Sequence, residues 1–263
     1  MLLILKNIIF YIYSFISTLI ENILFKHSIL LDQNKDIQKK GFQLFKLPNK
    51  LNLPVNTDEK FAANPYLNKI ILSELQIQKL IKIIFIDNSF AKKISSLTGF
   101  NYNIDHITAY ETCHFPQESY KEKNWYANLW HKDGPYSKNN IKIIVPLSDI
   151  GDESGAMKII SSTRSSKYSP AMGVEKKFNP DLEFKSEALK NILIFCPHLC
   201  LHKAGNPDPK KTRKQLMFQI NPSSKWSFNK NLYKNQKLLE PKFPLLNNLL
   251  KNKNKKVELF KIV

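Results

Sequence analysis

Short apolar segments separated by turns constrain the fold of this chain most strongly. The segments cover residues 141–147, 156–160, 192–196 and 215–220, and each has the length of a strand. They do not alternate regularly with long helical segments, which argues against a parallel sheet with crossover helices. The pattern therefore predicts a mainly β protein with flanking helices, in which the strands form a sandwich or a barrel.

Signals for helices and further strands precede these segments. Apolar residues recur at helical spacing over residues 69–86, and residues 91–97 carry a shorter signal of the same kind. Residues 41–48 and 106–111 have the composition of strands, whereas residues 58–66 are expected to form a loop. The helices are expected to pack outside the β core.

A pair of potential metal ligands lies just before the first of the four segments. His131 and Asp133 are separated by one residue, so on a strand their imidazole nitrogen and carboxylate oxygen would point to the same side. A further histidine, His202, follows residues 192–196. Two imidazoles and one carboxylate on one face of a metal form the facial triad of non-haem Fe(II) oxygenases. A lone His-x-Asp pair also arises by chance or for packing, so it requires independent support.

Arg213 provides that support. Ten residues rich in turn formers separate it from His202, so the two are expected to return side by side on neighbouring strands. Of the 40 Lys+Arg residues, only Arg164 and Arg213 are arginine. A guanidinium binds a carboxylate through two parallel hydrogen bonds, which suits the distal carboxylate of a keto acid held by the metal. An ordinary surface arginine is the alternative interpretation.

These motifs, in this order and spacing, resemble the phytanoyl-CoA dioxygenase family of Fe(II)/2-oxoglutarate oxygenases. The resemblance runs from about Asn34 to about Pro222. Residues 161–163, Ser-Ser-Thr, depart from the Pro-Gly-Ser of the family's pattern. The residues that carry the resemblance are Trp130-His131-Lys132-Asp133-Gly134-Pro135-Tyr136, then Pro146-Leu147-Ser148-Asp149, Glu153-Ser154-Gly155-Ala156-Met157-Lys158-Ile159-Ile160, His202 and Arg213.

The resemblance implies a double-stranded β-helix, that is, a jelly-roll or cupin-like core. A chain of 263 residues can bury one such core and carry extensions. We expect an N-terminal apolar or amphipathic helix in residues 1–30, the dioxygenase domain in residues 31–225, and a Lys- and Asn-rich extension in residues 226–263. The polar stretches at residues 115–128 and 161–185 are expected to border the substrate.

The resemblance also implies the chemistry. It places iron ligands at His131, Asp133 and His202, a 2-oxoglutarate anchor at Arg213, and Tyr110 near the co-substrate. Fe(II) would then act with 2-oxoglutarate and O2, releasing succinate and CO2. The expected reaction is the hydroxylation of a small molecule or lipid-like substrate, whose identity the sequence leaves open.

A zinc site is the rival interpretation of one of these segments. Cys196, His198, Cys200 and His202 occupy every second position, and thiolates with imidazoles suit Zn²⁺. Alternate residues of one strand are about 6.7 Å apart, so four of them span too far for a single ion. Cys196 and Cys200 are therefore expected to be small buried residues. With Cys113 they make three cysteines, which cannot all pair, and reduced thiols indicate a cytoplasmic protein.

The net charge of +18 would suit a nucleic acid or an anionic membrane. Lysine is enriched together with Asn and Ile along the whole chain, and no nucleic-acid motif is present. We therefore expect a small-molecule substrate and no nucleic-acid partner. The oligomeric state remains open.

Residues 1–26 are mostly apolar but fall short of the roughly 20 uninterrupted apolar residues of a spanning helix, and they lack a small-residue cleavage site. Their apolar face is expected on a membrane surface, in a dimer interface, or packed on the domain. Peripheral membrane contact is thus one expectation, and a non-enzymatic basic β-sandwich that docks to anionic membranes is the alternative function. The polar residues lie near one stripe at helical spacing: Asn7, Ser14, Ser17, Thr18 and Glu21.

Overall fold

The computed structural model describes residues 2–27, 37, 40–46, 59–61, 64–116, 129–134, 136–168, 184–185, 191–229, 245, 249 and 256–261. Most of residues 115–128 and 161–185, which the sequence predicts to border the substrate, lie outside this part of the chain. The strand-length segments and the candidate metal ligands all lie within it.

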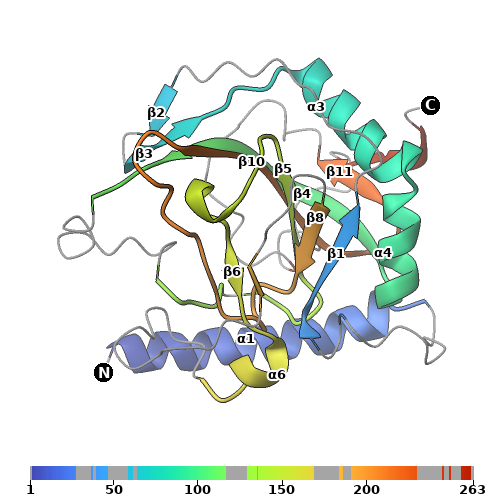
Figure 1. Ribbon diagram of the computed structural model, residues 1–263. Coiled ribbons are helices and arrows are strands. Elements are labelled where there is room, and N and C mark those ends of the chain that lie inside the picture. The colour runs from blue at the N-terminus through green and yellow to red at the C-terminus, as the bar shows by residue number, and fades with distance from the viewer. Residues whose placement is uncertain are drawn as a thin grey trace.

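A large sheet forms the centre of the molecule (Figure 1). Its pairs are antiparallel except for the parallel pairing of β11 with β4. A hairpin of β2 (Glu59–Phe61) and β3 (Asn64–Lys69) is attached to β4 through β3. The main order is β1 (Phe42–Lys46), β8 (Asn191–Phe195), β5 (Ile141–Pro146), β10 (Thr212–Ser223), β4 (Asn101–Cys113), β11 (Ser227–Asn229) and β12 (Lys256–Glu258).

A second, smaller sheet contains β7 (Phe184–Lys185), β6 (Lys158–Ile159) and β9 (His202–Lys203) in that order. His131 extends it through an isolated antiparallel bridge to His202. From β4 onward the chain visits the large sheet, the His131 segment, β5, then β6 and β7, β8, β9 and finally β10. This alternation between two sheets is the path of a double-stranded β-helix, so the predicted fold class is confirmed.

Alternating side chains of β10 serve two separate cores. Leu216 and Phe218 pack in the larger core, on the side of the sheet that the helices cover, whereas Met217 packs in the core between the two sheets. Because alternate residues of a strand share a face, Arg213 and Gln215 face the space between the sheets as Met217 does. The strand thus brings polar side chains into the interior of the β-helix.

Helices cover the outer face of the large sheet (Figure 1). Helix α3 (Glu74–Ile81) begins with a capping box formed by Ser73 and Gln76, and it continues into a π-helical segment, η1 (Lys82–Asp87). Helix α4 (Phe90–Thr98) follows. Phe85 of η1 packs edge-on against Phe218 of β10, with ring centroids 5.1 Å apart. The helical prediction for residues 69–86 therefore holds from residue 74 onward, and the prediction for residues 91–97 holds throughout.

The loop predicted for residues 58–66 is wrong, since β2 and the start of β3 occupy part of it. Leu67 to Lys69 pair with Thr112 to Tyr110 at the edge of β4. The segment has few β-branched residues, so its extended form depends on pairing with β4 rather than on its own propensity.

Helix α1 (Leu2–Phe25) lies across one end of the β core, as Figure 1 shows. The predicted polar stripe faces the domain, because Ser14, Ser17 and Glu21 are each at most 2% exposed. The expectation that the apolar face packs on the domain is therefore wrong. Residues Ile8–Phe25 are also long and apolar enough to cross a membrane by length and composition alone.

Candidate metal centre

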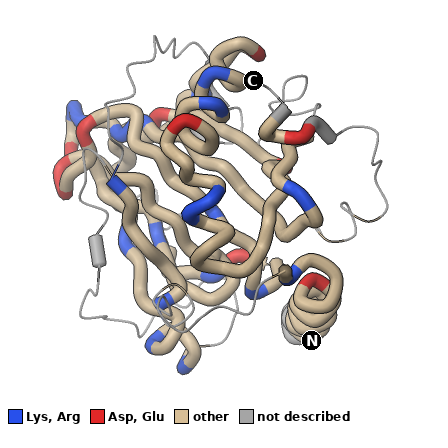
Figure 2. The backbone as a smooth tube through the Cα atoms, turned by 90° about the vertical axis from the view of Figure 1, so that its right-hand side faces the viewer, with Lys and Arg blue, Asp and Glu red and all other residues tan. Residues whose placement is uncertain are grey.

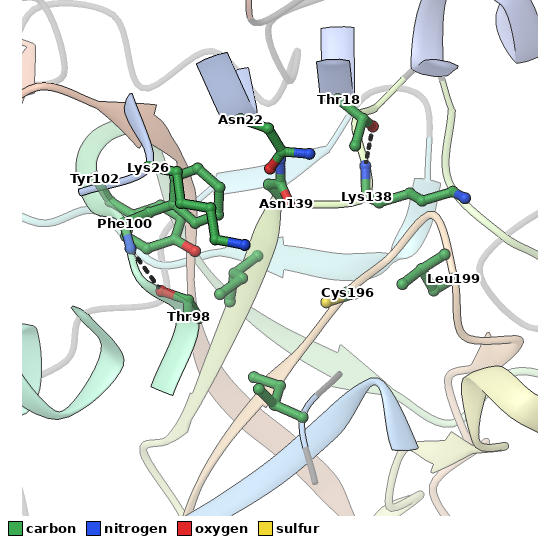
Figure 3. A pocket seen from close by; sticks show the side chains of 12 residues that line it. Thr18, Asn22, Lys26, Thr98, Phe100, Tyr102, Lys138, Asn139, Cys196 and Leu199 are labelled. Atoms are coloured by element: carbon green, nitrogen blue, oxygen red, sulfur yellow. Dashed lines mark hydrogen bonds between the residues drawn. The ribbon is translucent and has the colours of Figure 1, made fainter. Parts of the chain in front are cut away.

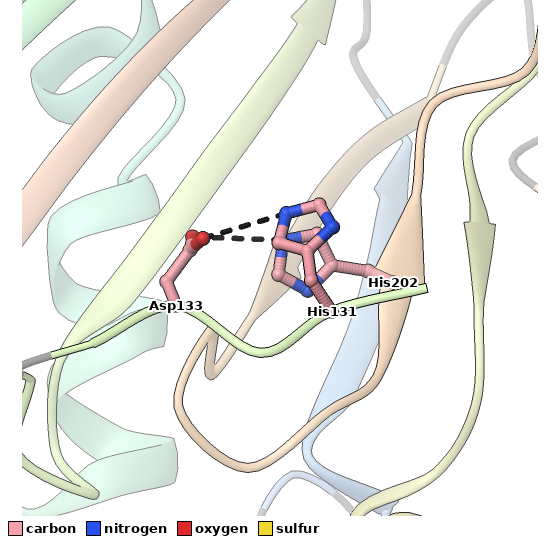
Figure 4. Close-up of side chains that lie close together, drawn as sticks. All are labelled: His131, Asp133 and His202. Atoms are coloured by element: carbon pink, nitrogen blue, oxygen red, sulfur yellow. Dashed lines mark ion pairs between the residues drawn. The ribbon is translucent and has the colours of Figure 1, made fainter. Parts of the chain in front are cut away.

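Two chain segments about seventy residues apart hold the three candidate ligands on one face. The backbones of His131 and His202 exchange hydrogen bonds of 3.1 and 3.0 Å, and the Asp133 amide donates to the Pro197 carbonyl at 2.9 Å. The segment around His131 is thus anchored to the opposite segment without forming a longer strand. The ligand atoms of His131, Asp133 and His202 all lie within 4.8 Å of one another, and all three side chains are buried (Figure 4).

The orientation of the two imidazoles fits a metal ion. Nδ1 of His131 lies 2.6 Å from the Leu129 carbonyl oxygen, and Nδ1 of His202 lies 3.0 Å from the Cys200 carbonyl oxygen. Since a carbonyl can only accept, each Nδ1 donates a proton, and each Nε2 of the neutral ring presents a lone pair. This backbone support of the non-ligating nitrogen is typical of metal-binding histidines.

Both Nε2 atoms face the carboxylate of Asp133. The distances are 3.5 Å from His131 Nε2 to Oδ1 and 3.5 Å from His202 Nε2 to Oδ2. Ligands that share one ion at ~2.1 Å lie ~3 Å apart when they are at right angles. The donor set and its spacing therefore suit a divalent cation with only a small adjustment of the side chains.

The electrostatics of the site favour the protonation states that a metal requires. Burial, followed by the neighbouring His202, lowers the pKa of His131 to about 3. Burial alone would raise the pKa of Asp133, but the charge of Lys142 and then the two histidines hold it well below its usual range. At neutral pH a neutral His131 thus faces an ionised carboxylate.

Lys142 is the residue that the sequence analysis missed. Its Nζ lies 2.7 Å from Oδ2 of Asp133, and both side chains are 7% exposed. Lys142 is the only charged residue within β5, between Ile141 and Ile143. A lysine inside an apolar strand was the available signal, since strand alternation turns it toward the same interior face as Ile144.

Arg213 lies in the interior but not where its predicted strand pairing would put it. His202 belongs to β9 of the small sheet, whereas Arg213 belongs to β10 of the large sheet, so the prediction of neighbouring strands is wrong. The two strands face each other across the β-helix, because the turn between them carries the chain from one sheet to the other. The guanidinium still reaches the His202 side, since Nη1 donates to the Gly205 carbonyl at 3.3 Å.

The environment of Arg213 is unusual for a cation. The side chain is 2% exposed, and Nη2 donates to Thr112 Oγ1 at 3.3 Å. Nε is buried without a hydrogen-bond partner, and none of the ion pairs among the described residues involves Arg213. Burial lowers the pKa of Arg213, an effect that Tyr110 partly opposes. A surface arginine, the alternative interpretation, is excluded.

Tyr110, which the sequence places near the co-substrate, lies close enough to this guanidinium to affect the pKa of Arg213. It pairs with Gln215 across β4 and β10, and the Gln215 amide donates to its hydroxyl. Its ring packs against the core between the sheets. Thr112, Tyr110 and Gln215 therefore form a polar wall beside Arg213.

The described residues do not support the zinc alternative. Cys196 and Cys200 pack in different apolar clusters, and His198 is hydrogen-bonded to Ser14 of α1 at 2.9 Å. Burial raises the pKa of Cys196 to about 12, which opposes the thiolate form that a zinc ligand requires. Both cysteines are buried, as predicted, and neither forms a disulfide.

A separate cavity of about 320 Å³ lies between α1 and the end of the large sheet (Figure 3). Its wall includes Thr18 and Asn22 of α1, Tyr102 of β4 and Cys196. None of its lining residues is a candidate metal ligand, so it is distinct from the metal centre.

The comparisons with known proteins concern the fold. No family model matches the chain, and no curated protein matches its sequence. The chain is similar to the non-haem alpha-ketoglutarate-dependent epimerase SnoN from nogalamycin biosynthesis, with 11% identity, a TM-score of 0.45, and coverage of 71% of this chain and 80% of that one. HygX from Streptomyces hygroscopicus, solved with nickel, 2-oxoglutarate and hygromycin B, has 9% identity, a TM-score of 0.44 and coverage of 72% and 86%. EvdO2 from Micromonospora carbonacea var. aurantiaca has 12% identity, a TM-score of 0.44 and coverage of 75% and 97%.

Proposed function

We propose that this chain is an Fe(II)/2-oxoglutarate-dependent oxygenase of the kind that the phytanoyl-CoA dioxygenase family represents. The observation that carries the proposal is the buried guanidinium of Arg213, which has no acidic partner among the described residues and faces the same interior as the His131, Asp133 and His202 cluster. The metal ligands alone would also suit other divalent-metal enzymes. A metal-dependent hydrolase leaves the buried guanidinium unexplained.

A buried charge without a partner is costly, so a protein keeps one where a ligand supplies the opposite charge. Arg213 has free donor capacity at Nε, and its two other contacts are long for charged hydrogen bonds. A carboxylate that reaches it could take up that capacity. A dicarboxylic keto acid has one end for the metal and one carboxylate for Arg213.

The protein groups then have distinct tasks. His131, Asp133 and His202 hold the metal, and Lys142 keeps the Asp133 carboxylate ionised and oriented through its 2.7 Å contact. The Phe195 ring packs against the His202 imidazole, with centroids 4.9 Å apart, and limits its rotation. Fe(II) with 2-oxoglutarate and O2 supplies the oxidation, with succinate and CO2 as by-products.

We propose hydroxylation of a small molecule or lipid-like substrate as the reaction, at a cytoplasmic location and without a nucleic-acid partner. The presence of Asp133 in the ligand set favours hydroxylation over halogenation, in which a halide takes the place of the carboxylate. Cys113, Cys196 and Cys200 form no disulfide, which is consistent with a reducing compartment.

Thermal denaturation under anaerobic conditions tests the proposal. Fe(II) with 2-oxoglutarate at about a hundred times the dissociation constant adds ~2.7 kcal/mol of stability, which raises Tm by ~5–10 °C for a chain of this size. His131→Ala should abolish this rise, and His27→Ala, at an exposed histidine, should retain it. Uncoupled succinate release from 2-oxoglutarate gives a second readout. Wild-type protein without any ligand-dependent rise in Tm would contradict the proposal.

The alternative function, a non-enzymatic protein that docks to anionic membranes, gives no role to the metal cluster or to Arg213. Membrane docking through α1 is compatible with the enzyme and rests on separate observations.

A further inference from the structure

Helix α1 has the reverse of the polarity expected for a helix at the surface of a soluble domain. Its polar stripe faces the protein, and most of its large apolar side chains face outward. Ile8, Phe15 and Ile23 are 50%, 61% and 71% exposed, respectively. A soluble surface helix places its apolar face on the core, so this arrangement requires a reason.

Hydrogen bonds attach the polar stripe firmly to the domain. Ser14 contacts His198 at 2.9 Å, and the backbone amide of Lys138 donates to Thr18 at 3.0 Å. The Asn139 amide donates to Glu21 at 3.1 Å. Since the polar stripe is occupied by these contacts, α1 cannot turn its apolar face inward without breaking them.

The outward apolar surface is wide. At about 100° per residue, the outward apolar side chains other than Leu24 spread over an arc of about 160° around the helix axis and over about 27 Å along it. Asn22 is the polar residue within that arc, and it accepts a hydrogen bond from Asn139. The outward apolar residues are Leu5, Ile8, Ile9, Tyr11, Ile12, Phe15, Ile16, Leu19, Ile23 and Leu24.

The width of this surface distinguishes between occupants. A single partner helix, as in a dimer of this chain, contacts a narrow stripe of about two positions in seven and would leave both flanks exposed. The hydrocarbon region of a bilayer covers every side chain that is immersed in it, so it can cover the whole arc.

Positive charge lies at the border of the apolar surface. Lys26 directly follows α1, and the backbone amide of Lys138 donates a hydrogen bond to Thr18 at the edge of the helix (Figure 3). Both lysines are exposed. In Figure 2, α1 is seen nearly end-on and is almost entirely uncharged, whereas lysines are scattered over the β domain. The chain's net charge of +18 complements an anionic leaflet.

We propose that α1 docks this protein to the surface of an anionic lipid bilayer. The helix lies in the plane of the leaflet, with its apolar arc among the acyl chains and with Lys26 and Lys138 at the level of the headgroups. The contacts to His198, Lys138 and Asn139 hold the β domain against the helix in the bound state. This inference goes beyond the proposed oxygenase function and does not depend on it.

Vesicle flotation of the full chain, without metal or 2-oxoglutarate, tests the proposal. We expect binding to vesicles of phosphatidylcholine and phosphatidylserine in equal parts, and weaker binding to phosphatidylcholine alone. The variant Ile12→Gln/Phe15→Gln/Leu19→Gln should lower the partition coefficient by about a hundredfold or more, because three large apolar side chains no longer enter the bilayer. Its Tm should stay near that of wild type, since the three positions are 50%, 61% and 52% exposed.

A matched control carries the same number of changes at exposed apolar positions away from α1. Ile71→Gln/Leu75→Gln/Phe260→Gln should bind the vesicles as wild type does. Lys26→Gln/Lys138→Gln should weaken binding to the phosphatidylserine vesicles by about tenfold or more, with little effect on phosphatidylcholine vesicles.

Three outcomes would overturn the proposal. The first is wild-type protein that does not float with the mixed vesicles. The second is an α1 triple variant that binds them as well as wild type. The third is that wild type sediments as a dimer and the α1 triple variant as a monomer, while neither protein binds vesicles. That result would assign the apolar surface to a second copy of the chain.

Discussion

Replacing Arg213 by methionine should stabilise the ligand-free protein. The guanidinium is 2% exposed and makes two hydrogen bonds of 3.3 Å, and its Nε is unpaired. Replacing a buried ion pair by apolar side chains of similar volume often stabilises a protein by about 1–4 kcal/mol, and a buried charge without an opposite charge is costlier to keep than a pair. At ~2–4 °C per kcal/mol for a chain of this size, Arg213→Met should raise Tm by several degrees.

The same substitution should remove the binding of 2-oxoglutarate. Truncating one partner of a buried charge pair costs about 2–5 kcal/mol, which corresponds to a dissociation constant raised by at least ~30-fold. The rise in Tm that Fe(II) and 2-oxoglutarate give the wild type should therefore disappear, although Fe(II) alone still binds. Arg213→Lys should behave similarly toward 2-oxoglutarate, since an ammonium cannot form two parallel hydrogen bonds.

Thermal melts of wild type, Arg213→Met and Arg164→Met, each with and without ligand, measure both effects. Arg164 is the other arginine of the chain, and it is exposed, so Arg164→Met should change neither quantity. A fall in the Tm of ligand-free Arg213→Met by several degrees would mean that the guanidinium is satisfied within the protein. An unchanged response to 2-oxoglutarate would refute its role as the anchor.

Further substitutions test other contacts. Lys142→Met leaves Asp133 buried without the ammonium group that lies 2.7 Å from it, so Tm should fall by the equivalent of about 3–5 kcal/mol. In the same thermal melts, Fe(II) should stabilise this variant more than it stabilises wild type. Burial raises the pKa of Glu21 from 4.5 to about 7. The protonated side chain therefore contributes its full stability below about pH 4.5, and this contribution is lost as the pH rises through 7. Glu21→Gln should flatten the resulting fall in Tm between pH 5 and pH 8. Gly155 has φ +72°, and an added Cβ would lie 2.6 Å from the Pro207 nitrogen, so Gly155→Ala should destabilise by more than about 1 kcal/mol in urea unfolding, whereas Gly151→Ala, with open space around it, should not.

Local patterns in the sequence predicted the elements whose structure depends on local residues. The apolar strands, α1 and α3 follow from periodicity. His131, Asp133 and His202 do lie together, but not on the strand that the His-x-Asp spacing predicted, because only His131 makes a β bridge there. Periodicity alone predicted only that the strands form a sandwich or a barrel. The resemblance to a known family implied the double-stranded β-helix, in which the chain alternates between two sheets.

The features that escaped prediction depend on contacts between distant segments. The β2–β3 hairpin exists because β4 offers an open edge, and β9 and β10 lie in opposite sheets although only a turn separates them. The orientation of α1 depends on partners such as His198 and Asn139, which no pattern within residues 1–26 reveals. Lys142 was detectable in principle, as a cation within an apolar strand, but its partner was not.

The charges between the two sheets connect the metal to the co-substrate. Asp133, Lys142 and Arg213 leave one excess positive charge in this low-dielectric space when the histidines are neutral. A divalent metal alone adds two positive charges to it, and a dicarboxylate alone lacks the metal that would hold its keto end. Together they add no net charge, so each should favour the binding of the other. Coupling of this kind is typically ~1–3 kcal/mol, which makes 2-oxoglutarate bind about 5–150-fold more tightly to the metal-loaded protein in calorimetric titration. Equal affinities with and without metal would mean that the two ligands do not share this interior.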